Sequence, residues 1–168
     1  MRRITLTAVA AVLALGIASA PIVQAREPGP TIVGAALAVN ASTGQFGYLI
    51  AAVQRAGLVD TLNGNRQLTV FAPTDAAFRA LFATLGVSGV NDIPVSTLRA
   101  VLLYHVAPGE RFAADVVSSS RIRTVSKGFL WPSVNGSGVY VNDAQVIAAD
   151  IDVSNGVIHV INRVLLPA

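Results

Sequence analysis

Hydrophobic side chains in the first two thirds of the chain recur mainly at intervals of three and four residues, the spacing that predicts helices. We predict helices over residues 31–40, 46–56, 75–85 and 94–106. Thr31 and Thr74 are suited to cap the first and third helices, because a threonine hydroxyl accepts a hydrogen bond from a backbone amide in the first turn. Gly57 and Gly86 favour the ends of the second and third helices, and the Ala-Pro-Gly run at 107–109 ends the fourth.

A different pattern begins after residue 120, where short apolar runs alternate with glycine and asparagine. These runs predict strands over residues 121–125, 129–134, 139–141, 144–149 and 157–165. Asn135-Gly136 predicts a hairpin turn, and the serines at 118–120 predict a loop. An earlier apolar run at 68–72 predicts a buried strand that ends at Pro73, because proline has no backbone N–H to pair. Helices followed by mainly antiparallel strands, with the early strand and the last strand at the centre, predict an α+β domain.

The first 25 residues have the pattern of a signal peptide. Arg2 and Arg3 precede an apolar run at 4–20, and small residues occupy the positions where a signal peptidase cuts. We predict cleavage after Ala25, since a cut after Ala20 would leave a proline first. The apolar run is short for a membrane span of about 20 residues, although a retained anchor is the alternative. We expect a secreted or periplasmic protein without a transmembrane anchor after cleavage.

The rest of the chain predicts a short tail at 26–30 and a single domain at 31–168. Without Arg2 and Arg3 the 12 basic residues fall to 10 against 9 acidic residues, so the net charge of +3 falls to about +1. Such a balance argues against a nucleic-acid partner. The chain has no cysteine, so disulfides and thiolate metal sites are excluded.

Three motifs, in this order and spacing, resemble the boxes that define a fasciclin domain. They are TVFAPTDAAF at 69–78, Tyr-His at 104–105, and Ala-Asp-Ile at 149–151 continuing through NGVIHVI at 155–161 to Leu-Leu-Pro at 165–167. The resemblance covers about residues 31–167 and implies a wedge of mainly antiparallel strands with packed helices.

The resemblance also implies a function and a set of residues. Fasciclin domains are extracellular, and their usual role is adhesion to a cell-surface or matrix component, either protein or polysaccharide. In animal members the positions of Tyr104, His105, Asp150 and Ile151 have been assigned to integrin binding. Some single-domain relatives instead carry carotenoids or other apolar small molecules, so a carrier is the alternative function.

The two histidines, His105 and His159, are the main candidates for chemistry, because an imidazole can bind a metal or transfer a proton near neutral pH. Both lie among apolar residues, which favours buried and hydrogen-bonded rings. No further ligands have the spacing of a zinc site, and no serine has a nucleophile motif around it. We therefore expect no metal, no cofactor and no enzymatic activity. Asp75 is expected to stabilise the start of its helix.

Five aromatic residues are not accounted for by the helices and boxes. Core packing is favoured for most of them, and the alternative is an exposed ligand patch made by Phe129, Trp131 and Tyr140. The other two aromatic residues are Tyr48 and Phe112.

Overall fold

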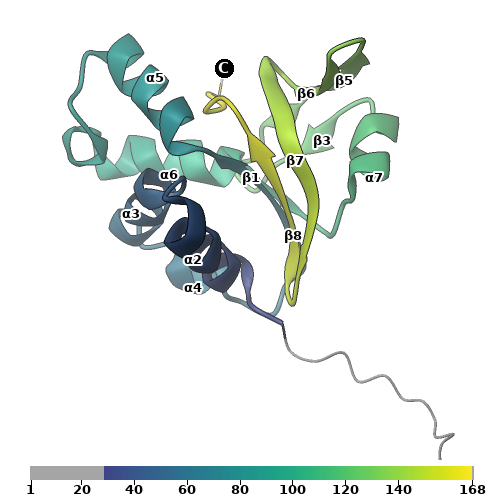
Figure 1. Ribbon diagram of the computed structural model, residues 1–168, viewed down its shortest axis with the longest axis horizontal. Helices are drawn as coiled ribbons and strands as arrows, with labels where there is room; N and C mark the ends of the chain where they lie inside the picture. Colours follow the sequence, from purple (N-terminus) through teal and green to yellow (C-terminus); the bar gives the residue numbers. More distant parts are fainter. Residues whose placement is uncertain (1–28, 168) are drawn as a thin grey trace, which may run out of the picture.

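The computed structural model describes residues 29–167, so the predicted signal peptide and residues 26–28 of the predicted tail lie outside the described residues. Five helices and a 3-10 turn pack on one side of a sheet, and a short helix, α7, lies on the other side (Figure 1). On the first side are α2 (Ile32–Thr43), α3 (Gly47–Arg55), α4 (Val59–Leu62), α5 (Asp75–Leu85), η2 (Val90–Asp92) and α6 (Val95–Tyr104). Helix α7 spans Ala113–Ser118.

The main sheet has six strands in the order β2-β1-β8-β7-β6-β5. Strands β1 and β8 run parallel and every other pair is antiparallel, which confirms the predicted α+β class with the early and last strands at the centre. The strands are β1 (Leu68–Pro73), β2 (Val106–Pro108), β5 (Pro132–Asn135), β6 (Gly138–Val141), β7 (Ala144–Val153) and β8 (Gly156–Ile161). A separate two-stranded sheet pairs β3 (Ile122–Arg123) with β4 (Phe129–Leu130).

The predicted caps are present at the helix ends. The Thr31 hydroxyl accepts a hydrogen bond of 3.2 Å from the Gly34 amide, and the Thr74 hydroxyl accepts one of 3.3 Å from Ala77. Gly86 ends α5 in the left-handed conformation that glycine adopts without strain. Helix α2 continues three residues beyond the predicted end at residue 40.

The prediction that the fourth helix runs to residue 106 is wrong. Helix α6 ends at Tyr104, and the next residues form β2. The reason is tertiary: Val106 pairs with Val70 of β1, and the Phe71 amide donates to the His105 carbonyl. The backbone hydrogen bonds that this segment forms with β1 take the place of those in a further helical turn.

Other boundaries also differ from the sequence prediction. The serine run is partly helical, because α7 extends to Ser118. The strand predicted at 129–134 divides at Trp131 into β4 and β5, which pair with different partners. Strand β7 continues to Val153 through two irregularities in its pairing with β8, whereas β8 ends at Ile161. The predicted hairpin is confirmed, but its turn lies one residue later, at Gly136 and Ser137, because Asn135 pairs with Gly138.

Strands β1 and β8 are buried along their whole length and separate two apolar layers. The larger layer fills the space between the helices α2–α6 and the sheet. The smaller layer lies on the other face and includes Phe71, Val116, Ile122, Leu130, Ile161 and Leu165. At the start of β8, Gly156 has a φ of +152° and a side chain there would overlap the Leu68 carbonyl, so glycine permits the close approach of β1 and β8.

Candidate functional site

His105 lies in the interior at the end of α6 and is 2% exposed. Its Nδ1 lies 2.7 Å from the Val101 carbonyl oxygen, so this nitrogen carries the proton and donates. Its Nε2 accepts a hydrogen bond of 2.8 Å from the Leu165 amide. Burial lowers the pKa of His105 to about 4, although the bond to Val101 opposes the shift. The neutral ring is fully hydrogen-bonded and joins α6 to the C-terminal segment.

Tyr104 is also buried, and its hydroxyl is bonded on both sides. The hydroxyl donates to the Phe129 carbonyl at 2.7 Å and accepts from Asn142 Nδ2 at 3.3 Å. A Cβ at Gly128 would lie only 2.7 Å from the tyrosine ring, so the backbone passes directly over it. Tyr104 therefore supports the segment around Phe129 from beneath.

His159 lies on β8 and is 1% exposed. Its Nε2 donates to the Arg111 carbonyl at 2.8 Å, and its Nδ1 accepts from the Asp150 amide at 3.3 Å. The ring stacks on Phe71 with 5.5 Å between centroids. Burial lowers the pKa of His159, while the bond to Arg111 and the charge of Asp150 oppose the shift. This ring also has no free nitrogen for a metal or a proton transfer.

Asp150 and Ile151 lie in the irregular part of β7. Asp150 has a φ of +58°, and its exposed carboxylate accepts a hydrogen bond of 2.6 Å from the amide of Ala113, the first residue of α7. Ile151 is half-buried and faces the helix layer. The structure therefore does not bring Tyr104, His105, Asp150 and Ile151 together on one exposed surface.

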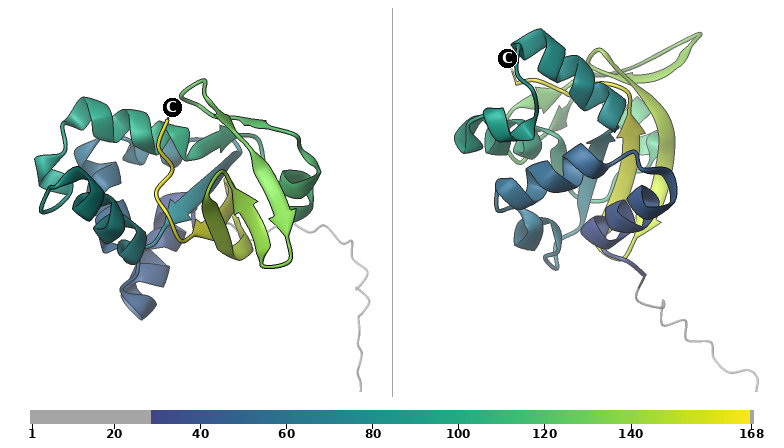
Figure 2. Two further views of the ribbon diagram at one scale, coloured as in Figure 1. Left: turned by 90° about the horizontal axis from the view of Figure 1, so that it is seen from above. Right: turned by 60° about the vertical axis from the view of Figure 1, so that its left-hand side comes forward.

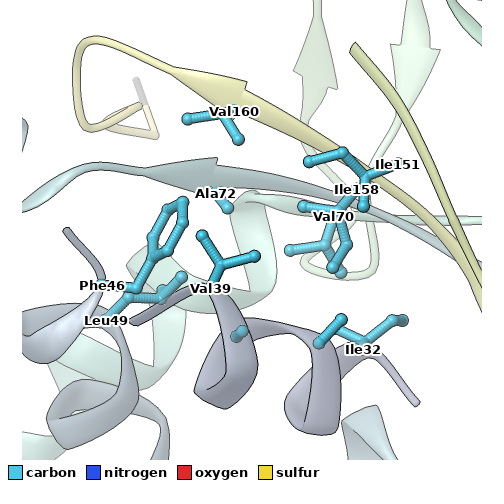
Figure 3. Close-up of a pocket in the computed structure, with 11 residues that line it drawn as sticks. Ile32, Val39, Phe46, Leu49, Val70, Ala72, Ile151, Ile158 and Val160 are labelled. Atoms are coloured by element: carbon cyan, nitrogen blue, oxygen red, sulfur yellow. The ribbon is translucent and has the colours of Figure 1, made fainter. Parts of the chain in front are cut away.

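An apolar cavity of about 20 Å³ lies between α2 and the sheet. Figure 3 shows Ile32 and Val39 of α2 with Phe46 and Leu49, facing the strand residues across the cavity. The space is enough for about one small atom group, so it holds no sizeable ligand in this conformation.

A larger groove of about 260 Å³ opens between α2, α3 and α4. Aliphatic side chains line it almost throughout, and its polar lining residues are Gln54 and Asn63. Leu37 on its rim is 47% exposed. Helix α2 carries no charged residue, so an apolar surface continues along it.

Phe129 on β4, Trp131 in the link between β4 and β5, and Tyr140 on β6 are the residues of the predicted aromatic patch, and we call them the aromatic face. Trp131 is 55% exposed, and its ring lies 6.5 Å from that of Phe129. The register of β5 with β6 places Tyr140 opposite Ser133, two residues beyond Trp131. Helix α2 lies far from the β5–β6 hairpin (Figure 1), and none of these three rings lines the groove beside that helix.

The expectation that most of the five unassigned aromatic residues pack in the core is wrong. Trp131 and Phe112 are exposed, and the other three are only partly buried. For Phe129 and Trp131 the cause is the alternation of side chains along an extended segment, since Leu130 turns inward and its two neighbours turn outward. Tyr48, in contrast, does pack against Phe78 and Phe82.

Sequence reasoning missed Asn142, which fixes the backbone of Trp131. The Asn142 side chain accepts from the Trp131 amide at 2.9 Å, and the Asn142 amide donates to the Trp131 carbonyl at 2.9 Å. Asn142 has a φ of +54°, a conformation that asparagine tolerates better than most residues. An asparagine followed by aspartate between two short strands was the available signal.

Metal binding has no support in the part of the chain that the structure describes. No group of three histidine, cysteine or carboxylate side chains converges there. Among the helices of residues 29–167, none is long and apolar enough to cross a membrane.

The sequence model of the Fasciclin domain matches residues 44–167. Protein sll1483 of Synechocystis is 43% identical over 129 residues, which cover 77% of this chain and 71% of that protein. The pig transforming growth factor-beta-induced protein ig-h3 is 37% identical over 135 residues, but these span 20% of its length.

Similarity in structure points to the same fold. The FAS1 domain pair of fasciclin I, an insect cell adhesion molecule, superimposes with a TM-score of 0.68 over 83% of this chain and 51% of the other, at 19% identity. The helix layer and mixed sheet described above agree with that fold. With its three boxes, its fold and its relatives in agreement, the chain belongs to the fasciclin domain family.

Proposed function

We propose that this domain is an extracytoplasmic adhesion module that binds a cell-surface or matrix component through the aromatic face. The observation that carries the proposal is Trp131, a large apolar side chain that is 55% exposed on a backbone held by two hydrogen bonds. Exposed tryptophan and tyrosine on a rigid surface are typical of binding sites. The relationship to fasciclin I, a cell adhesion molecule, supports the same class of function.

The buried histidines favour binding over catalysis. Both rings of His105 and His159 use their two nitrogens in hydrogen bonds to the protein, so neither is available as a general base. Tyr104 contributes by supporting the aromatic face. Asp150 stays a candidate contact at the surface, although its carboxylate already holds the start of α7.

The test is attachment of producing cells to a surface or to one another. Replacing Trp131 with alanine removes a ring that is 55% exposed and that contacts the Phe129 ring, so we expect attachment to fall at least fivefold while the melting temperature changes little. Leu85→Ala is the matched control, because Leu85 is 48% exposed on the far end of α5. Equal attachment by the wild type and the Trp131 variant would contradict the proposal.

A second candidate function is transport of an apolar small molecule such as a carotenoid. The groove between α2, α3 and α4 favours it, because its volume of about 260 Å³ approaches that of ligand pockets and its lining is mainly apolar. Protein purified from its native host should then carry an extractable lipid or pigment, and Leu37→Asp should abolish the loading. A colourless preparation without extractable lipid would exclude the carrier function.

A further inference from the structure

The aromatic face is bordered by cations. Arg123 lies opposite Phe129 in the pairing of β3 with β4, and the same register continued places Arg121 opposite Trp131. The Arg121 guanidinium lies 4.4 Å from the centroid of the Phe129 ring, a cation–π contact. Lys127 lies in the turn between these two strands. We call Arg121, Arg123 and Lys127 the basic rim.

The charges of the basic rim are not neutralised. Its three side chains are exposed, and among residues 29–167 none of them forms an ion pair. Asp143 is the first carboxylate that follows the aromatic face in the sequence. It is already paired with Arg163 at 2.8 Å. A ligand with carboxylate or sulfate groups would therefore meet guanidinium groups that are free to form charge-assisted hydrogen bonds.

The aromatic face and basic rim are held rigidly from within. Tyr104 bonds both the Phe129 carbonyl and the Asn142 side chain, and Asn142 holds Trp131 at two points. The turn of β3 and β4 is tied to the end of α6, because the Ser126 amide donates to the Leu103 carbonyl. A surface ordered in advance loses less entropy when it binds.

We propose that the aromatic face and the basic rim together bind an acidic polysaccharide, an inference that rests on the adhesion function proposed above. The C–H faces of sugar rings are apolar and stack on the negative face of the exposed Trp131 ring, while Phe129 supports Arg121 beside it. Arg121 and Arg123 pair with the carboxylate or sulfate groups of the same chain. The β5–β6 hairpin that carries Tyr140 extends beyond the body of the molecule (Figure 2), where a long polymer can pass.

A polysaccharide fits this surface better than a folded protein does. A stable protein interface buries about 800 Å² on each partner around an apolar centre. Here the two arginines lie directly across from Phe129 and Trp131, and the polar Ser133 lies two residues beyond Trp131 along the chain. Rings and cations side by side match the sugar rings and acidic groups of a linear polymer.

The experiment measures binding of the purified full chain to alginate, a polymer of uronic acids, and to neutral dextran by calorimetry. We expect binding to alginate at 20 mM NaCl that weakens at least tenfold at 500 mM, and no binding to dextran. Arg121→Gln combined with Arg123→Gln should weaken alginate binding at least tenfold, and Trp131→Ala should weaken it similarly. Arg66→Gln, a change at an exposed arginine in the turn before β1, should have no effect.

Three results would overturn the inference. The first is equal affinity for dextran and alginate, and the second is no effect of the double arginine variant. The third is that the protein binds neither alginate nor a second acidic polymer, dextran sulfate. Melting temperatures of the variants show whether a loss of binding arises from misfolding. If Trp131→Ala reduces cell attachment while both acidic polymers fail to bind, the adhesion function stands and the polysaccharide inference is wrong, which leaves a protein partner. If attachment is also unchanged, the adhesion function fails as well.

Discussion

At the scale of single residues, His105 makes the stability of the domain depend on pH. Its pKa is lowered to about 4 in the folded state by burial, whereas a histidine in an unfolded chain titrates near 6.5. The neutral ring therefore contributes stability that is fully present above about pH 6.5 and is lost as the pH falls toward 4. At about 1.4 kcal/mol per pKa unit, we expect a loss of about 3 kcal/mol over this range.

Urea unfolding between pH 7.5 and 4.5 measures this loss. His105→Asn should be less stable than the wild type at pH 7.5, but its free energy of unfolding should change less with pH. His159→Gln is the companion variant, because the chain has only these two histidines and the pKa of His159 is also lowered. An unchanged pH slope in the double variant would show that other groups cause it.

Tyr104 belongs to the Tyr-His motif, but it supports the binding surface from the interior. Resemblance to the family suggested it as a contact, yet its ring is 5% exposed. Its hydroxyl instead holds the backbone of the aromatic face. A residue of this kind affects binding by positioning other side chains.

At the scale of the elements, one buried polar side chain adds hydrogen bonds to the apolar packing that holds α2 on the sheet. Asn155, between β7 and β8, accepts from the Ile32 amide at 2.9 Å and donates to the carbonyls of Leu62 and Gly64 at 2.7 Å and 3.2 Å. It thus joins the start of α2 and the end of α4 to the central strands. The apolar groove described above lies between these helices.

Asn155→Ala should loosen α2 more than the rest of the domain. It leaves one buried amide and a buried carbonyl without partners, which costs about 2 to 4 kcal/mol in total. Hydrogen exchange in α2 should increase well beyond the change in β8. Ser154→Ala is the control, since this exposed hydroxyl makes a single long bond of 3.3 Å to Pro30, and equal exchange in both variants would contradict the role of Asn155.

At the scale of the whole molecule, the C-terminal segment closes the smaller apolar layer. Beyond β8 the chain leaves the sheet (Figure 1). Leu165 inserts with 1% exposure, and its amide donates a hydrogen bond to His105. Leu166 points outward and is 49% exposed. Residues up to 165 are therefore part of the folded unit.

A chain ending at Arg163 should be destabilised by about 2 to 5 kcal/mol, because it loses the buried Leu165 side chain and leaves His105 Nε2 without its donor. A chain ending at Leu166 should keep the stability of the wild type. Thermal unfolding of the two truncated proteins measures the difference. Equal melting temperatures would show that Leu165 contributes little.

Features that depend on neighbouring residues were predictable from the sequence. The Thr74 cap and the Gly86 end of α5 each involve groups three or four residues apart, so the local pattern contains all the information. The fold class was predictable for a related reason, since the motifs combine these local requirements in a characteristic order. Neither conclusion requires knowledge of distant contacts.

The family, the α+β class and most of the helices follow from the sequence alone. The tertiary structure was needed to show that Val106 pairs with Val70, that Trp131 turns outward, and that Tyr104 and His105 are buried. The pairing of Val106 and the burial of Tyr104 and His105 depend on partners that lie 25 to 60 residues away, as the bonds from Tyr104 to Phe129 and from Leu165 to His105 show. The candidate binding surface is one of these outcomes, because exposure is set by what the rest of the chain leaves uncovered.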